Sequence, residues 1–203
     1  MNRIIVTGQG TDVGKTVVAC IVATILKADY WKPVECGAES DSKTVQQLLR
    51  RDVVHPPHYS LMAPLSPHAA AKLEGISLDF EAISPPKTER PLVMETAGGI
   101  FVPITTTTLV IDLFSKWNAS WIIVSKHYLG SINHTLLTWQ ALQLRNVPIL
   151  GVIFNGEPNP DSEEAILAIS KMPFLARLLP EQSVNRVMIQ RYAQEWKSAF
   201  SHL

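Results

Sequence analysis

The chain alternates short apolar runs with longer segments that mix apolar and polar positions. The short runs are rich in β-branched residues and predict strands, over Arg3–Thr7, Tyr30–Val34, Pro91–Glu95, Ser120–Ser125 and Pro148–Phe154. The mixed segments have helical spacing and predict helices over Lys15–Ala28, Ser42–Arg50, Leu109–Trp117, Ser131–Arg145, Ser162–Lys171 and a last one near Ser183–Phe200.

Strands that alternate with helices in this way predict an α/β fold: a mostly parallel sheet with helices on both faces. The strands are almost continuously apolar, as in Trp121-Ile122-Ile123-Val124, which indicates burial on both sides. Pro-rich patches between Arg50 and Arg90 indicate loops and do not require a second domain. We therefore expect residues 1–203 to form one domain with its ligand site at the carboxyl ends of the strands.

Composition limits the partners and the compartment. The 203 residues are 46% hydrophobic, and their formal net charge is zero. A neutral chain creates no general field for nucleic acid or an anionic membrane, so we expect neither partner. Strand and loop follow Arg3 at once, and the longest apolar run, Val17–Leu26, has ten residues. The sequence therefore predicts neither a signal peptide nor a membrane span. Cys20 and Cys36 lack metal-binding or CxxC spacing, which favours a reducing, cytoplasmic setting.

The most specific motif is Gly8–Thr16, G-Q-G-T-D-V-G-K-T, between the first strand and the first helix. Glycines let successive backbone N–H groups turn toward one anion, and the helix N-terminus adds positive potential. Lys15 is expected to reach the outer phosphates of a nucleotide, and the Thr16 hydroxyl to bind Mg²⁺. Five residues separate Gly8 from Gly14, where the common phosphate-binding loop has four. The motif predicts a nucleotide-binding enzyme or switch.

Three charged residues stand near the ends of other predicted strands. Lys32, held by the following proline, either projects into the phosphate site opposite Lys15 or is an ordinary edge lysine. Asp41 lies at a predicted helix N-cap, where its carboxylate either caps the helix or approaches a metal. Glu95 precedes small residues that leave room for a ligand, which favours a metal-binding role over a merely solvated one.

The two remaining strand ends carry weaker signals. Gly130 and Ser131 open a helix, whose free N–H groups suit a carboxylate, although Ser131 could simply cap the helix. His134 is more typical of a helix face than of a catalyst. The amide of Asn155 could both donate to and accept from a purine ring, but Asn-Gly is also a common turn.

Taken in order, these segments resemble the ATP-dependent dethiobiotin synthetase family. The long loop together with the E-x-A-G-G and L-G-x-I-N-H segments makes the resemblance specific, and the extra residue in the loop is a feature of this family. The matching segments run through most of the chain and are Gly8–Thr16, K-P-V-E-C-G at 32–37, S-D at 40–41, S-P-H-A-A at 66–70, E-T-A-G-G-I-F-V-P-I at 95–104, L-G-S-I-N-H at 129–134 and F-N-G at 154–156.

The resemblance implies a homodimeric P-loop enzyme that closes the cyclic urea of dethiobiotin in biotin synthesis. Its substrates are 7,8-diaminononanoate (7,8-diaminopelargonate), CO₂ and ATP, with Mg²⁺ as the metal. One amine takes up CO₂ as a carbamate, ATP phosphorylates that carbamate, and the second amine attacks the mixed anhydride. ADP and phosphate are released. Such catalysis needs reactants held together and charge neutralised, more than acid–base groups.

The resemblance also implies roles for individual residues. Lys15 and Lys32 would flank the carbamate and the transferred phosphoryl group, and Cys36 would contact the substrate. Mg²⁺ would be held by Thr16, Asp41 and Glu95. The nucleotide would contact Asp12, Val13, Gly14, Lys15, Thr16, Val17, Asp41, Glu95, Thr96, Ala97 and Gly98, with Asn155, Leu179, Pro180 and Glu181 around adenine. The substrate's carboxylate would bind Gly130, Ser131, Ile132 and Asn133 across the dimer interface.

Two positions depart from the family pattern, and two other classes of protein compete with it. Cys36 stands where the family commonly has a hydroxyl residue, and Gln9-Gly10 where Thr-Asp is frequent. A P-loop partitioning switch usually has a second lysine early in the loop, where this chain has Gln9 and Gly10. An amidotransferase-type synthetase acting on a corrinoid needs a glutamine-hydrolysing domain, which 203 residues do not accommodate.

Overall fold

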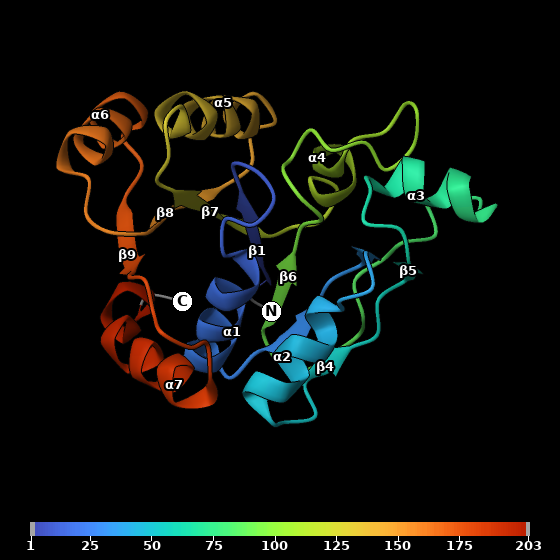
Figure 1. Cartoon of the computed structure of the whole chain (residues 1–203), viewed down its shortest axis with the longest axis horizontal. Helices are drawn as coiled ribbons and strands as arrows, with labels where there is room; N and C mark the ends of the chain where they lie inside the picture. Colours follow the sequence, from blue (N-terminus) through green and yellow to red (C-terminus); the bar gives the residue numbers. More distant parts are fainter. Residues whose placement is uncertain (1–2, 202–203) are drawn as a thin grey trace.

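A seven-stranded sheet forms the centre of the molecule (Figure 1). The computed structural model describes residues 3–201. All the strand pairs of this sheet are parallel, which confirms the predicted α/β class. The strands in spatial order are β4 (Val54–His55), β2 (Asp29–Trp31), β6 (Leu92–Glu95), β1 (Arg3–Gly8), β7 (Ser120–Lys126), β8 (Ile149–Asn155) and β9 (Phe174–Leu178).

Helices cover both faces of the sheet because successive strand residues are apolar and point to opposite sides. Ile4 and Val6 of β1 join one apolar cluster, while Ile5 between them joins another. On the side of Ile4 lie α1 (Lys15–Leu26), α2 (Asp41–Leu49), α7 (Arg186–Glu195) and the 3₁₀ helix η1 (Lys197–Phe200). On the side of Ile5 lie α4 (Val110–Phe114), α5 (Ser131–Leu144) and α6 (Pro160–Ser170).

The prediction of one strand over Tyr30–Val34 is wrong, because the chain leaves the main sheet there. Strand β2 ends at Trp31, and β3 (Val34–Cys36) pairs with β5 (Tyr59–Leu61) in a separate two-stranded sheet. Pro33 between them has no N–H to donate, and its carbonyl accepts bonds from the N–H groups of His58 and Tyr59. Lys32 therefore lies at the break, beyond the carboxyl end of β2.

Other elements also differ from the predicted ones. The region predicted as loops between Arg50 and Arg90 contains β4, β5 and α3 (Pro67–Glu74). The last predicted helix is two elements, α7 and η1. Strand β9 is missing from the prediction because Arg177 interrupts its short apolar run. In the structure, Arg177 bonds to Glu163 on α6, and this partner explains the charged residue in the strand.

The order of the strands determines which loops lie next to one another at the carboxyl ends of the sheet, where a ligand would bind. Strand β1 is central, between β6 and β7, and the phosphate-loop motif follows it directly. All strands of this sheet point the same way, so the segments after β1, β2, β6, β7 and β8 meet along one edge. Among residues 3–201, no helix is both long and apolar enough to cross a membrane.

Candidate active site

The phosphate loop joins β1 to α1 in the form the motif predicts. Gly14 is the N-cap of α1 with φ of 91°, a left-handed conformation that favours glycine. It has no side chain to cap the helix, so the first-turn N–H groups remain available to an anion. A Cβ on Gly14 would lie 2.5 Å from Asn155 Nδ2. Asp12 is also left-handed, with φ of 57°. The loop therefore has the curvature of an anion-binding nest.

Lys15 is folded back over its own loop. Its Nζ donates to the carbonyl oxygen of Gly10 at 2.8 Å, and the residue is 5% exposed. Burial lowers the pKa of Lys15, while the nearby Glu95 carboxylate acts in the opposite direction. A buried cation held by a carbonyl is costly without an anion, so this site favours a bound phosphate.

Four side chains from four segments meet beside the loop. The Thr16 hydroxyl lies 2.9 Å from Asp41 Oδ1 and 2.9 Å from Glu95 Oε1, and it donates its one proton to either. Lys32 Nζ donates to Asp41 Oδ2, and to Glu95 Oε1 at 3.1 Å. Thr16 begins α1, Asp41 begins α2, Glu95 ends β6 and Lys32 follows β2. The two carboxylates thus share one cation and one hydroxyl.

The electrostatics of Lys32 reflect these neighbours. Its side chain is 8% exposed, and burial by itself lowers the pKa of the ammonium group. The Glu95 and Asp41 carboxylates outweigh burial and hold the pKa of Lys32 above its ordinary value. The lysine is therefore a fixed cation at neutral pH and not a general base.

Tyr30 on β2 forms a hydrogen bond with Glu95. Its hydroxyl donates to Glu95 Oε2 at 2.8 Å, and both residues are buried. Burial and the adjacent Glu95 carboxylate raise the pKa of Tyr30, which keeps the phenol protonated and able to donate. Sequence reasoning missed this residue, because a tyrosine inside an apolar strand carries no functional signal.

The prediction that Asp41 is the N-cap of α2 is wrong. Ser40 is the N-cap and accepts from the Lys43 N–H at 3.2 Å, while Asp41 is the first helical residue. Glu35 completes the cap, since its carboxylate accepts from Ser40 Oγ and the Ser42 N–H, both at 2.7 Å. The Asp41 carboxylate is therefore free of the capping role and faces Lys32 and Thr16.

The segment after β6 packs closely against the phosphate loop. Thr96 is buried, and its hydroxyl lies 3.0 Å from that of Thr7 and donates to the Gly98 carbonyl. Gly98 has φ of 67°, and a Cβ there would lie 2.9 Å from Val102. A Cβ on Gly99 would lie 3.6 Å from the Gly10 Cα. Gly98 is thus constrained by its own φ and by Val102 of the same segment, whereas Gly99 is in ordinary van der Waals contact with the loop. Ala97 before them is half-buried.

The predicted base-binding residues lie together beyond β8 and β9. Asn155 Nδ2 donates to the Val13 carbonyl at 2.9 Å, so part of the amide supports the phosphate loop. The Gly156 N–H donates to the Leu178 carbonyl, which brings the two strand ends side by side. Past Leu178, the Leu179 N–H donates to the Tyr192 hydroxyl, exposed Pro180 follows, and Glu181 pairs with Arg191 at 2.5 Å.

A partly buried ion cluster, which the sequence did not predict, stabilises the same edge of the sheet. Glu163 on α6 accepts from both guanidinium nitrogens of Arg177 on β9, from His127 Nε2 at 2.8 Å and from the Asn159 N–H at 3.0 Å. The His127 ring stacks on Phe154 with centroids 5.4 Å apart. The cluster joins β7, β9 and the segment after β8, and thereby fixes where Asn155 lies.

Glu163→Gln is expected to lower the free energy of unfolding near neutral pH. Bonds from Arg177, against the opposing effect of burial, lower the pKa of Glu163 from 4.5 to about 2. Partial exposure of Arg177 reduces the corresponding stabilisation to about 1–2 kcal/mol. This stabilisation is complete above pH 4.5 and is lost as the pH falls toward 2. Urea unfolding near neutral pH and in acid should show the variant approaching the parent in acid.

The matched control for this prediction is Glu164→Gln at the exposed neighbouring position. It removes the same charge from α6 without touching Arg177, so its unfolding free energy should follow that of the parent at both pH values. An equal loss in both variants would mean that helix charge, and not the ion cluster, is responsible.

Helix α5 begins at the carboxyl end of β7, beside the phosphate loop. Gly130 is its N-cap with φ of 102°, Ser131 is buried, Ile132 is half-buried and Asn133 is exposed. The fully exposed Leu129 precedes them. Cys36, at the end of β3, is half-buried, and burial raises the pKa of its thiol to about 11. The thiol is therefore protonated at neutral pH and is not a nucleophile.

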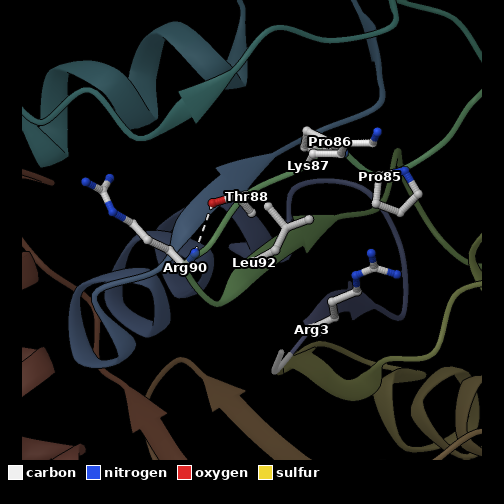
Figure 2. Close-up of a pocket in the computed structure, with 7 residues that line it drawn as sticks. All are labelled: Arg3, Pro85, Pro86, Lys87, Thr88, Arg90 and Leu92. Carbon is white, nitrogen blue, oxygen red and sulfur yellow. Dashed lines mark hydrogen bonds between the residues drawn. The ribbon is translucent and has the colours of Figure 1, made fainter.

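A separate cavity of about 210 Å³ opens at the opposite end of the sheet (Figure 2). It is bordered by Arg3 and Leu92, the first residues of β1 and β6. Figure 2 shows the side chains of Arg3 and Arg90 directed away from each other, so they do not converge on one ligand. The rest of its lining is Pro85, Pro86, Lys87 and Thr88. The chemistry assembled at the phosphate loop is therefore distant from this cavity.

The fold and the loop define a P-loop nucleotide-binding protein. Solved structures agree: a putative plasmid partition protein from Borrelia burgdorferi bound to AMPPNP is 12% identical, with a TM-score of 0.60 over 99% of this chain and 98% of that one. The septum site-determining protein MinD of Pyrococcus horikoshii, complexed with Mg-ADP, is 14% identical, with a TM-score of 0.55 over 98% and 91%. At these identities the likeness shows the fold alone.

Sequence relatives define the family more narrowly. A family described as "AAA domain" matches residues 2–187. The ATP-dependent dethiobiotin synthetase BioD of Chlamydia pneumoniae is 43% identical over 203 residues, covering 99% of this chain and 92% of that protein. The enzyme of the same name from Rhodopseudomonas palustris strain TIE-1 is 46% identical over 180 residues, covering 87% and 85%. The chain belongs to the ATP-dependent dethiobiotin synthetase family, as its motifs predict.

Proposed function

We propose that this protein is an ATP-dependent ligase that closes the cyclic urea of dethiobiotin from 7,8-diaminononanoate, CO₂ and ATP in biotin biosynthesis. Family membership supports the reaction. The observation that carries the proposal is the meeting of Thr16, Lys32, Asp41 and Glu95 beside a phosphate loop that holds Lys15. This arrangement suits transfer of a phosphoryl group to a small anion.

The two lysines supply the electrostatic part of the reaction. One substrate amine adds to CO₂ and loses a proton, which gives a carbamate anion. A carbamate oxygen attacks the γ-phosphorus of ATP and ADP leaves; the second amine then attacks the carbamoyl carbon, phosphate is expelled, and the amine loses one proton to give the neutral urea. Lys15 neutralises charge on the transferred phosphoryl group, while Lys32 holds the carbamate oxygens. Fixed cations at a buried site stabilise such developing charge without reorganising.

The residues present fit a magnesium ion. Two carboxylates each lie within hydrogen-bond distance of one hydroxyl, and hard oxygen ligands of this kind are the ones Mg²⁺ prefers. Thr16, Asp41 and Glu95 would hold the ion, directly or through its water. When bound, Mg²⁺ neutralises the phosphate oxygens of ATP. The Tyr30 hydroxyl and the Glu35 cap would keep the two carboxylates in place.

Asp41→Asn and Glu95→Gln are expected to weaken metal-dependent nucleotide binding. Each replaces one negative ligand with a neutral amide of nearly the same shape. Loss of a group that merely supports a ligand typically costs about 10–100-fold in metal affinity, and loss of a charged ligand should cost at least as much. Titration of Mg²⁺ into protein with ADP, followed calorimetrically, measures the effect directly. Glu39→Gln, exposed two residues before Asp41, is the matched control and should bind Mg²⁺ like the parent; equal weakening in Glu39→Gln would argue against direct ligation.

The remaining ligand contacts follow from the positions of the segments around the site. The first turn of α5, from Gly130 to Asn133, would bind the carboxylate of the diamine through free N–H groups. Cys36 would lie along the substrate. Asp12 to Val17 and Thr96 to Gly98 would surround the phosphates, and adenine would lie between Asn155 and the segment Leu179 to Glu181. We propose a cytoplasmic homodimer in which α5 serves the site across the interface, with neither nucleic acid nor membrane as a partner.

Phosphate release tests the proposed function. Purified protein is supplied with ATP, Mg²⁺ and bicarbonate, with and without 7,8-diaminononanoate. We expect release that depends on the diamine and a cyclic urea product in the mass spectrum. Release that does not require the diamine would instead indicate a switch ATPase of the partition type, whose fold this chain shares.

A further inference from the structure

Gln9 in the phosphate loop uses both ends of its amide on one neighbouring segment. Its Nε2 donates to the carbonyl of Lys126, the last residue of β7, at 2.8 Å. Its Oε1 accepts from the hydroxyl of Thr135, in the second turn of α5, at 2.8 Å. The two partners lie on either side of Gly130–Asn133 in the sequence. The Gln9 side chain therefore contacts the chain both before and after the residues that begin α5.

A second contact joins the same two parts of the molecule. Lys126 Nζ donates to the carbonyl of Asp12, on the far side of the phosphate loop, at 3.3 Å. Asp12 has the left-handed φ of 57° that gives the loop its curvature. Gln9 and Lys126 thus link the phosphate loop to the end of β7 by two side-chain contacts, one donated from each part.

The Thr135 hydroxyl has two alternative acceptors, Gln9 in the phosphate loop and the Ser131 carbonyl in the first turn of α5. Thr135 is fully buried, and its hydroxyl lies 2.8 Å from Gln9 Oε1, 2.7 Å from the Ser131 carbonyl and 2.8 Å from Ser125 Oγ. The hydroxyl has one proton, while the amide and carbonyl oxygens can only accept. Gln9 and the first turn of α5 therefore compete for the same proton, and Ser125 can donate to Thr135 in either state.

We infer that Gln9 is a positioning residue that couples the phosphate loop of one protomer to the first turn of its own α5, which serves the partner's site, so that nucleotide in one site and diamine in the other bind cooperatively. The inference rests on the proposed function, which puts the phosphates of ATP in the loop and the substrate's carboxylate at Gly130–Asn133. A ligand that moves the phosphate loop or the first turn of α5 also determines whether the Thr135 hydroxyl donates to Gln9 or to the Ser131 carbonyl. By thermodynamic linkage, the effect is equal in both directions.

The chemistry of the amide suits Gln9 to both contacts. The side chain must donate to the Lys126 carbonyl and accept from Thr135 at the same time. Glutamate cannot donate to a carbonyl, and leucine can do neither. Gln9 itself is half-buried, whereas Ser125 and Thr135 are completely buried. The loop side chain is therefore the member of the network that a ligand can move.

Calorimetric binding of a non-hydrolysable ATP analogue with Mg²⁺, without bicarbonate, tests the inference. In the parent, saturating 7,8-diaminononanoate is expected to raise the affinity for the analogue about tenfold, within the usual range of coupling between sites. In Gln9→Leu and in Thr135→Val, the ratio of the two affinities should fall to about one. A residue that only stabilised the fold would lower both affinities and leave their ratio unchanged.

Thr138→Val is the matched control, because it lies on the same helix one turn further along. The Thr138 hydroxyl donates to the His134 carbonyl at 2.8 Å, the equivalent of the bond from Thr135 to Ser131. Removing it alters α5 without touching Gln9, so the parent's ratio should be retained. Thermal unfolding of each variant identifies any that has lost its fold. If Gln9→Leu or Thr135→Val is unfolded, the affinity ratio of the other one tests the inference.

The possible outcomes separate this inference from the proposed function. A parent that binds the analogue but gives no binding heat when 7,8-diaminononanoate is titrated into it overturns the proposed function and the coupling with it. A parent that binds both ligands independently overturns the coupling alone. The same holds if Gln9→Leu and Thr135→Val keep the parent's ratio, or if Thr138→Val loses it.

Discussion

Lys15→Ala is expected to lower kcat by about 10²–10³-fold, the usual cost of removing one preorganised charge-stabilising group. The ammonium group lies inside the phosphate loop, where it would neutralise the phosphoryl group during transfer. The free energy of unfolding should remain that of the parent or rise. Burial lowers the pKa of Lys15, and alanine removes a buried cation whose hydrogen-bond partner is a neutral carbonyl.

Steady-state phosphate release and urea unfolding measure these two effects separately. Lys43→Ala is the control, since Lys43 is exposed on α2 only two residues after Asp41. It should match the parent in both assays. Near-normal turnover in Lys15→Ala would exclude the loop lysine from the mechanism, whereas a large loss of stability would mean that the bond to Gly10 holds the loop together.

Lys32→Met is expected to reduce both activity and the stability of the metal-free protein. Methionine keeps most of the side-chain volume but leaves Asp41 and Glu95 together without their cation. Removing one partner from a buried ion pair typically costs about 3–5 kcal/mol. Saturating Mg²⁺ should recover much of this loss, because a cation bound by the same carboxylates replaces the missing charge. Product formation should still fall by about 10²–10³-fold, since the metal does not hold the carbamate.

Thermal unfolding with and without Mg²⁺, together with product formation, provides the measurement. Lys43→Met is the matched control and should show neither the loss of stability nor the response to metal. If Lys32→Met keeps the activity of the parent, Lys32 has no part in catalysis. If its stability falls but Mg²⁺ does not restore it, the two carboxylates are not the metal site.

The sequence predicted the parts of the site that depend on local pattern. A glycine-rich loop between a strand and a helix needs no distant contact to be recognised, and the loop is formed as predicted. Glu95 stands out because it ends an apolar run, whereas Lys32 lies inside the predicted strand Tyr30–Val34 and only the break before Pro33 places it at a strand end. Parallel strands bring their carboxyl ends to one edge, which favoured Glu95 near the loop, while the sequence left Lys32 open between the phosphate site and an ordinary edge lysine. Their catalytic roles stay predictions.

The errors arose where the identity of a residue depends on a partner far away in the sequence. Asp41 has the same pattern as a helix cap, and only the position of Glu35 and Ser40 shows that the cap is made without it. Strand β9 contains an arginine that breaks its apolar run, and Glu163 on α6 explains that charge. Neither partner can be identified from local spacing.

The sequence by itself determined the class of fold, the phosphate loop and the family, because these depend on hydrophobic periodicity and short motifs within single elements. The tertiary structure decided which groups surround those motifs. Tyr30 reaches Glu95 across 65 positions of sequence, and Gln9 reaches Thr135 across 126. Such pairs are set by strand order and register, which place residues from separate elements within hydrogen-bond distance, and no local pattern encodes that distance.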